Sequence, residues 1–296
     1  MNAKQFTILM ILAAFWGGSF LFMRIAVPEF GPVSLIVLRT GIAALFLIPV
    51  MLIRQRSKLD QITPNLKAFS MVALFNIALP FVLIAYALLN LTSGVGSVLN
   101  ATTPMFSALV GWLWLRQALS NSAMLGLLLG FTGVIILVGD KLSGNNGFSL
   151  LPVLCSLTAT ASYGFAVNYS RERLQGVESL ITATITQLLA TAMLFPLALI
   201  YWPEQLPSLI AWINVIALGV LSTGIAFILY FYLLKQIGAL HLSTVTFYVP
   251  VFGITFGVLL LDEQIGLQML IGAAIIIIGT MLSSGVWKIS GLERKA

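Results

Sequence analysis

Arg39 is the residue whose type and position point most directly to chemistry. It lies about six residues into a long apolar run, residues 33–53, which places it about 9 Å from one end of a helix that rises 1.5 Å per residue. A cation at such depth in an apolar segment usually faces a cavity or a partner. Arg39 is therefore expected to bind a ligand carboxylate, to contact freed backbone carbonyls, to pair with Glu29, or to extend its guanidinium to the membrane surface.

Two prolines in the middle of apolar runs are a second chemical signal. Pro104 and Pro250 have no amide hydrogen, so each frees the carbonyl four residues earlier, at Asn100 and Thr246. The sequence predicts a kink at each proline. Polar groups beside freed carbonyls at mid-membrane are typical of broken-helix binding sites, and the alternative is a kink with a purely structural role.

Other polar and aromatic side chains also fall near the middle of apolar runs. A serine or threonine there usually bonds its own helix, whereas asparagine and glutamine need a partner helix or water. Trp112 fits a lipid interface at least as well as a cavity. The candidate cavity residues are Trp16, Arg39, Asn76, Asn100, Thr103, Tyr163, Gln187, Thr246 and Tyr248.

The sequence offers little for catalysis or metal binding. Its one cysteine, Cys155, excludes an internal disulfide and a cysteine-based zinc site, and its one histidine, His241, fits the start of a helix better than proton coupling. No Asp or Glu lies at the centre of an apolar run. We therefore expect no cofactor, no metal and no intramembrane enzyme, and we disfavour exchange of hydrophobic cations, which needs an embedded carboxylate.

The elements that must position these residues are membrane-spanning helices. The chain has 59% hydrophobic and 8% charged residues and a mean hydropathy of +1.05, whereas a soluble domain carries about 25% charged residues. Its apolar runs are about twenty residues long, the length of a helix that crosses a bilayer. The prediction is an all-α integral membrane protein with ten spans, over residues 6–27, 33–53, 68–89, 94–115, 123–139, 148–169, 179–200, 209–233, 241–261 and 267–287.

The charges separate between the two sides of this arrangement. Glu29, Asp140, Glu204, Asp262 and Glu263 fall on one side, with only Arg24 and Lys141 near them. The other side holds Lys4, Arg54, Arg56, Lys58, Lys67, Arg116, Arg171, Arg173, Lys235, Lys288, Arg294 and Lys295. The positive-inside rule makes that side, with both termini, cytoplasmic. The net charge of +6 therefore indicates topology in a lipid bilayer and not nucleic-acid binding.

The chain also repeats itself. Trp16, Gly17, Arg24 and Pro49 recur 147 residues later as Tyr163, Gly164, Arg171 and Pro196, and Tyr86, Pro104, Phe106, Gly111, Leu113, Leu115, Gly126 and Gly133 recur 146 residues later. Five spans per copy require the second copy to cross the membrane upside down, as in secondary transporters with a site near the midplane. The predicted units are residues 1–140, an exterior linker 141–147, and residues 148–296 with a cytoplasmic tail.

Small residues predict where helices touch. Spacings of three or four residues between glycines allow close backbone approach where lipid gives no hydrophobic drive. Packing inside one monomer is the favoured interpretation, with homodimerisation through the fifth or tenth span as the alternative. The predicted packing positions are Gly126, Gly130, Gly133, Gly257, Gly272 and Gly279.

The Trp16-Gly17 pair followed by Arg24, the prolines and glycines of the fourth and ninth predicted spans, and residues 261–265 (Leu-Asp-Glu-Gln-Ile) resemble the EamA family of the drug/metabolite transporter superfamily. Asp262 stands where the family usually has glycine, and residues 115–117 of the first copy, Leu-Arg-Gln, lack the acid. The resemblance covers nearly the whole chain. It implies ten helices in two inverted five-helix repeats around a central cavity, often for export of amino acids or other metabolites.

The favoured hypothesis is a secondary transporter of the inner membrane that exports amino acids or similar small amphipathic metabolites by alternating access. An efflux pump for toxic solutes on the same fold is the nearest alternative, and a channel is a third. If Arg39 serves the site, Arg39→Ala abolishes transport in protein that still inserts.

Overall fold

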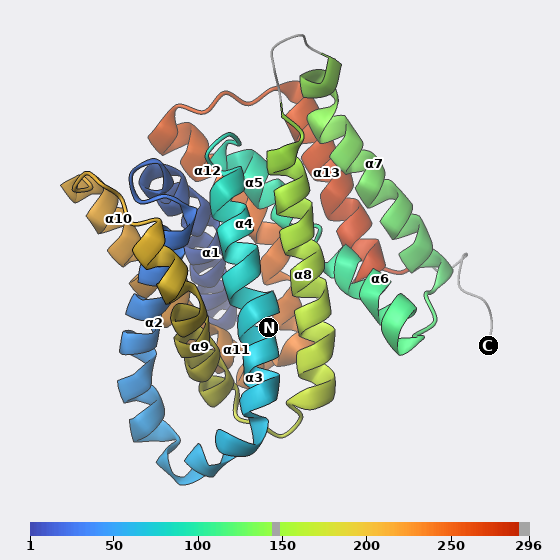
Figure 1. The fold of residues 1–296 in the computed structure, drawn as a ribbon. Coiled ribbons are helices and arrows are strands. Elements are labelled where there is room, and N and C mark those ends of the chain that lie inside the picture. The colour runs from blue at the N-terminus through green and yellow to red at the C-terminus, as the bar shows by residue number, and fades with distance from the viewer. Residues whose placement is uncertain (144–148, 290–296) are drawn as a thin grey trace.

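The computed structural model describes residues 1–143 and 149–289, and every regular element in them is helical (Figure 1). Eight helical segments of this part of the chain are long and apolar enough to cross a membrane. This finding agrees with an integral membrane protein. The eight segments are Ala3–Phe30, Pro32–Arg54, Arg56–Ala87, Ser93–Leu115, Asn121–Gly139, Ser179–Ile200, Leu209–Gly238 and His241–Leu261.

Two further helices correspond to predicted spans but are not among those eight. Helix α13, Leu267–Ser283, is apolar but has only 17 residues. Helix α8, Leu151–Arg173, has 23 residues but carries many hydroxyl groups, which lower its mean hydropathy. Both helices pack inside the helical assembly, α8 against α4 and α6, and α13 against α7.

Short connections join the remaining helices along the chain. Helix α7 continues through Ser143, so the first three residues of the predicted linker 141–147 are helical, and the rest of that linker lies outside the described residues. The predicted tail beyond residue 289 also lies outside them. The α-helices are α1 (Ala3–Phe30), α2 (Pro32–Arg54), α3 (Leu66–Ala73), α4 (Leu79–Ala87), α5 (Ser93–Asn100), α6 (Thr103–Leu115), α7 (Asn121–Ser143), α9 (Ser179–Ile200), α10 (Leu209–Gly219), α11 (Ala226–Ser243) and α12 (Val245–Leu261), with 3₁₀ turns η1 (Arg56–Gln61) and η2 (Thr63–Asn65) and π-helical segments η3 (Leu74–Ala78) and η4 (Val220–Ile225).

Helices α7 and α13 run antiparallel and touch through glycines (Figure 1). A Cβ atom on Gly126 would lie 2.6 Å from the carbonyl oxygen of Gly279, and one on Gly133 would lie 3.0 Å from that of Gly272. Any larger residue would push the two backbones apart. Gly130 also faces Met105, so these glycines serve packing within the chain.

Helices α2 and α9 also cross in opposite directions. The Ser34 hydroxyl donates to the Tyr201 carbonyl at 3.0 Å, and six residues further along α2 the Thr191 hydroxyl donates to Thr40 at 2.8 Å. These two contacts show that α2 and α9 are antiparallel where they cross. Such hydroxyl contacts join the helices where lipid gives no hydrophobic drive.

The first helix of each half packs on the other half. A Cβ on Gly17 of α1 would meet Phe252 and Gly253 of α12, and α8 approaches α6 in the same way through Gly164. Because no side chain separates the backbones at these two glycines, each crossing is as close as sterics allow.

The two prolines lie in different backbone surroundings, and the kink predicted at each of them stays a prediction. The chain breaks at Ala101 and Thr102, and Pro104 then occupies the first turn of α6, where a missing amide hydrogen costs nothing. The freed Asn100 carbonyl accepts the Thr103 hydroxyl at 2.8 Å. Pro250, by contrast, lies inside the continuous helix α12. In the second half the helix is interrupted at Thr244, between α11 and α12, so the break lies farther from Pro250 than the first break lies from Pro104.

Candidate functional site

A cavity of about 700 Å³ lies in the interior of the helical assembly. Residues from α1 to α6, from α8, α9, α11 and α12, from both π-helical segments and from the α8–α9 turn line it. Its polar lining residues include Ser19, Arg39, Asn76, Asn100, Thr103, Thr182, Thr186, Ser222, Thr223 and Thr246, and its aromatic ones are Trp16, Phe20, Phe81, Tyr163, Phe227, Tyr230 and Phe231.

The structure brings most of the predicted site residues to this cavity. Those that line it are Trp16, Arg39, Asn76, Asn100, Thr103, Tyr163 and Thr246. Gln187 and Tyr248 do not line it. Gln187 is fully buried on α9, and Tyr248 packs edge-on against Phe6 with ring centroids 6.4 Å apart.

Arg39 is held from three directions. Its Nε donates to the Thr223 hydroxyl at 3.1 Å, its Nη1 lies 3.5 Å from the Met23 sulfur, and its Cζ lies 3.8 Å above the Phe81 ring. The side chain is only 5% exposed, so it does not extend to the membrane surface. In the described part of the chain no carboxylate forms an ion pair with it. The guanidinium therefore presents an uncompensated positive charge to the cavity.

Glu29, which the sequence offered as a partner for Arg39, binds elsewhere. Its carboxylate accepts the backbone amide of Ser208 at 2.5 Å and the Ser208 hydroxyl at 2.8 Å. Ser208 is the N-cap of α10, and a carboxylate is stabilised at such a helix start. Pairing between Glu29 and Arg39 is therefore wrong.

Two lining residues have buried polar atoms without a protein partner in the described structure. They are Asn100 Oδ1 and Ser222 Oγ. A buried polar atom left unbonded costs free energy comparable to a lost hydrogen bond. Both atoms are suited to bind a polar group of a molecule in the cavity.

Sequence reasoning missed much of the aromatic wall. Trp16 contacts Tyr230 with ring centroids 5.7 Å apart, and Phe81 contacts Tyr163 with centroids 6.3 Å apart. Tyr230 and Phe81 stand in strongly apolar runs, where an aromatic residue gives no sign of facing a cavity. One usable signal is that Phe81 recurs as Phe227 at the 146-residue shift.

Several lining residues are related by the same sequence shift that relates the two halves. Trp16, Arg39, Asn76, Phe81 and Asn100 line the cavity, and so do the residues 146 or 147 positions later, which are Tyr163, Thr186, Ser222, Phe227 and Thr246. Asn76 and Ser222 lie in the two π-helical segments, which occupy equivalent places in both halves. Such π-helical segments are frequent at functional sites. Both halves therefore contribute equivalent positions to one cavity.

The two ends of the cavity differ. At the α8–α9 end, the wall includes Ser170, the exposed Arg171, and Leu174. At the α4–α5 end, side chains that are at most 1% exposed fill the interior, among them Val27 and Phe30. The cavity is thus bordered by the exposed Arg171 and the half-buried Ser170 at one end and closed by an apolar cluster at the other.

The turn between α8 and α9 is held by the segment between α2 and α3. The Glu178 carboxylate pairs with Lys58, and the Glu178 amide donates to Gln61 Oε1 at 3.0 Å. The hydrogen bond from Lys58 lowers the pKa of the Glu178 carboxyl below its usual range. This contact joins the first half of the chain to the second.

The model of the EamA-like transporter family matches residues 5–139 and 150–285. The chain belongs to the EamA-like transporter family. It is therefore a multi-pass membrane protein and a transporter, and its family and relatives indicate a transporter rather than an enzyme.

Relatives that are named as transporters match most of the length of this chain. The chain is 27% identical over 275 residues to the uncharacterized transporter YoaV of Bacillus subtilis, with 91% of this chain and 92% of that protein covered. It is 26% identical to the uncharacterized inner membrane transporter YedA of Escherichia coli K12, with 85% and 81% covered. A solved crystal structure matches with a TM-score of 0.67 at 18% identity, covering 97% of this chain and 98% of that one, which shows the fold alone.

Proposed function

We propose that this transporter is an inner-membrane carrier that exports amino acids or similar small amphipathic metabolites by alternating access. The observation that carries the proposal is the interior cavity, open at the α8–α9 end, with the uncompensated cation Arg39 in its wall. A buried positive charge with aromatic neighbours suits a small molecule that has both a carboxylate and an apolar part.

Ten spans in two inverted halves are part of this proposal. Helices α8 and α13 would add to the eight long apolar segments. The antiparallel crossing of α2 with α9, and of α7 with α13, supports inversion because the two helices of each pair are equivalent across the repeat. The shared lining positions support a site on the approximate two-fold axis between the halves.

The charges favour one orientation. Arg54, Arg56 and Lys58 lie near the α8–α9 turn with Arg171 and Arg173. The positive-inside rule would make this end cytoplasmic. The α4–α5 end would then be exterior, both termini would be cytoplasmic, and the cavity would open toward the cytoplasm.

The cavity also suggests how a zwitterion would be bound. Arg39 offers two-pronged hydrogen bonding to a carboxylate, while Asn100 Oδ1 is an unpartnered acceptor for an ammonium group. The aromatic surfaces of Trp16 and Tyr230 would contact the apolar part of the molecule. Because only one cation lies deep in this wall, a single carboxylate suits the site better than a polyanion.

Counterflow in proteoliposomes tests the proposal. Purified protein is loaded with a mixture of unlabelled amino acids, and uptake of each labelled amino acid is measured with and without the internal mixture. Trans-stimulated uptake is expected, because a carrier exchanges its substrate whereas a channel does not. Arg39→Gln should reduce exchange of carboxylate-bearing substrates by roughly tenfold to a hundredfold, the worth of a hydrogen-bonded charge.

The matching amine of each substrate, which lacks the carboxylate, is the control. Arg39→Gln should leave its weak uptake unchanged, provided that the variant elutes as a single species in detergent. Absence of trans-stimulation for every amino acid would contradict the substrate class, and stimulation by hydrophobic toxic solutes instead would favour an efflux pump.

A further inference from the structure

We propose that Arg24 and Arg171 are gate latches that close opposite ends of the cavity in turn. This inference rests on the proposed alternating access of inverted halves. The two arginines occupy equivalent positions, 147 residues apart, yet their surroundings in the structure are opposite. Arg24 lies at the closed α4–α5 end, and Arg171 lines the cavity near the α8–α9 turn.

Arg24 is engaged. From α1, its Nη1 donates to the Leu88 carbonyl at 2.5 Å and to the Leu89 carbonyl at 3.0 Å. These carbonyls end α4, which stops at Ala87, so they have no further helical partner. A cation at this position is also stabilised by the negative end of the helix dipole. Arg24 thereby ties α1 to the end of α4.

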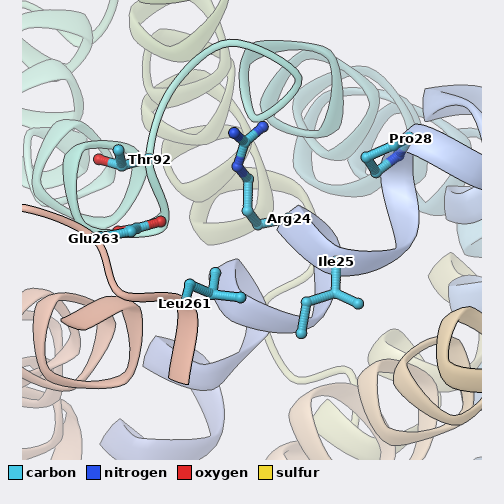
Figure 2. A pocket seen from close by; sticks show the side chains of 6 residues that line it. All are labelled: Arg24, Ile25, Pro28, Thr92, Leu261 and Glu263. Atoms are coloured by element: carbon cyan, nitrogen blue, oxygen red, sulfur yellow. The ribbon is translucent and has the colours of Figure 1, made fainter. Parts of the chain in front are cut away.

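Glu263 holds the other end of the same turn from the second half. Its Oε1 accepts the Ser93 amide at 2.7 Å, and its Oε2 accepts the Ser93 hydroxyl at 3.0 Å and the Gly94 amide at 3.1 Å. These groups begin α5. Arg24, Glu263 and Thr92 line a small pocket of about 330 Å³. Figure 2 shows Arg24 facing Thr92 and Glu263 around this pocket. The turn 88–92 is thus fastened at both ends.

Arg171 is exposed, and its guanidinium forms no hydrogen bond or ion pair with the described residues. The shift of 146 residues maps Leu88 and Leu89 onto Leu234 and Lys235. Leu234 lines the same cavity as Arg171. Three residues after Lys235, Gly238 leaves the helical conformation at φ 73°, so the helix is interrupted there as α4 is interrupted before Thr92.

Exchange of the conformations of the two inverted halves gives the opposite-facing state. In that state Arg171 binds the carbonyls of Leu234 and Lys235 and closes the α8–α9 end, while Arg24 releases Leu88 and Leu89. Each arginine thus makes its hydrogen bonds in only one of the two states. A contact of this kind shifts the equilibrium toward the state that has it.

Opposite effects of equivalent substitutions test the proposal. In a Cys155→Ser background, Ser19→Cys places a single thiol in the cavity wall. A membrane-impermeant maleimide added from the exterior then reports the outward-open population. Arg24→Gln should raise the labelling rate about tenfold, and Arg171→Gln should lower it about tenfold, as expected for the loss of hydrogen bonds from a charged donor.

Arg173→Gln is the matched control, because Arg173 is a neighbouring exposed arginine that does not line the cavity, and it should label at the unsubstituted rate. Glu263→Gln should also raise the labelling rate. If Arg24→Gln fails to elute as a single species, Glu263→Gln tests the closure of the exterior end in its place. Changes of the same sign in the Arg24 and Arg171 variants, or no change in either, would overturn the proposal. The labelling assay needs no substrate, so its result is independent of the counterflow assay. The proposed substrate class can therefore fail while the proposed latches are supported, and the latches can fail while the substrate class is supported.

Discussion

The ends of α6 and α12 have the same backbone and different chemistry. Arg116 and Asp262 both adopt the left-handed conformation, at φ 53° and 52°. In each case the next residue donates its amide to a glycine carbonyl at 3.1 Å, Gln117 to Gly111 and Glu263 to Gly257. Each side chain lies beside its glycine, Gln117 beside Gly111 and Glu263 beside Gly257, and the Glu263 carboxylate also accepts hydrogen bonds from the start of α5.

The two halves therefore share the backbone conformation of this turn but not the charged side chains on it. A turn fixed by backbone hydrogen bonds and a close glycine tolerates either side chain, so its shape survives the change. The side chain alone decides whether the turn fastens a neighbouring helix. In the cavity, the pair of Arg39 and Thr186 repeats the pattern, since both line the wall and only one is charged.

The largest expected effect concerns the shared scaffold. A Cβ on Gly17 would lie 2.8 Å from the Val249 carbonyl oxygen, and one on Gly164 would lie 2.7 Å from the Ser107 nitrogen. Because backbone cannot move aside cheaply, Gly17→Ala and Gly164→Ala should each destabilise the fold by about 3 kcal/mol. The measurement is the apparent melting temperature in detergent.

Gly18→Ala is the control for these substitutions, because its Cβ would meet only ring atoms of Phe256 and Phe22, the nearest at an ordinary 3.5 Å. It should melt near the unsubstituted protein. Strong destabilisation by Gly17→Ala with none by Gly164→Ala would break the equivalence of the two crossings.

An intermediate effect concerns the polar atoms that differ between the halves. Asn100→Ala and Ser222→Ala remove the unpartnered atoms in the cavity wall. Each substitution should weaken the apparent affinity for substrate by roughly threefold to tenfold, because it removes one neutral hydrogen bond to the substrate. The measurement is the concentration dependence of counterflow.

Ser156→Ala is the matched control for that pair. The Ser156 hydroxyl is equally buried and unpartnered in the described structure, but it does not line the cavity. Its loss should leave substrate affinity unchanged. An equal loss of affinity in all three variants would mean that position in the cavity is not what matters.

The smallest effect concerns the Lys58–Glu178 contact between the halves. Because Lys58 lowers the pKa of Glu178, the contact stabilises the folded state at neutral pH, above the ordinary glutamate pKa of about 4.3. That contribution is lost as the pH falls through the lowered pKa. Lys58 is half exposed, with 47% of its side chain accessible, so the contribution should be at most about 1 kcal/mol.

Glu178→Gln should remove this pH dependence from the melting temperature measured between pH 7 and pH 3. Gln61→Ala removes a contact to the Glu178 amide without removing the charge, and the acid-dependent change should persist in it. Identical pH profiles for Glu178→Gln and the unsubstituted protein would contradict the assignment.

Much of the helical structure could be predicted from hydropathy, because a helix in lipid must be apolar over a fixed length. The depth of Arg39 also followed from its position in such a run. The partner of Glu29 could not be predicted, because Ser208 is 179 positions away and no local pattern joins them. Gln187 and Tyr248 were equally polar candidates, but side-chain direction depends on how each helix is rotated against its neighbours.

The sequence by itself determined that this protein is helical, belongs in a membrane and repeats itself, because composition and period are local properties of the chain. Only the tertiary structure decided that Arg39 lies in a cavity without a counter-charge. It alone also showed that the Arg24 side chain is hydrogen-bonded while that of the equivalent Arg171 has no partner among the described residues. The physical reason is that equivalent residues of the two halves have different helices as neighbours, and those neighbours come together only in the folded state.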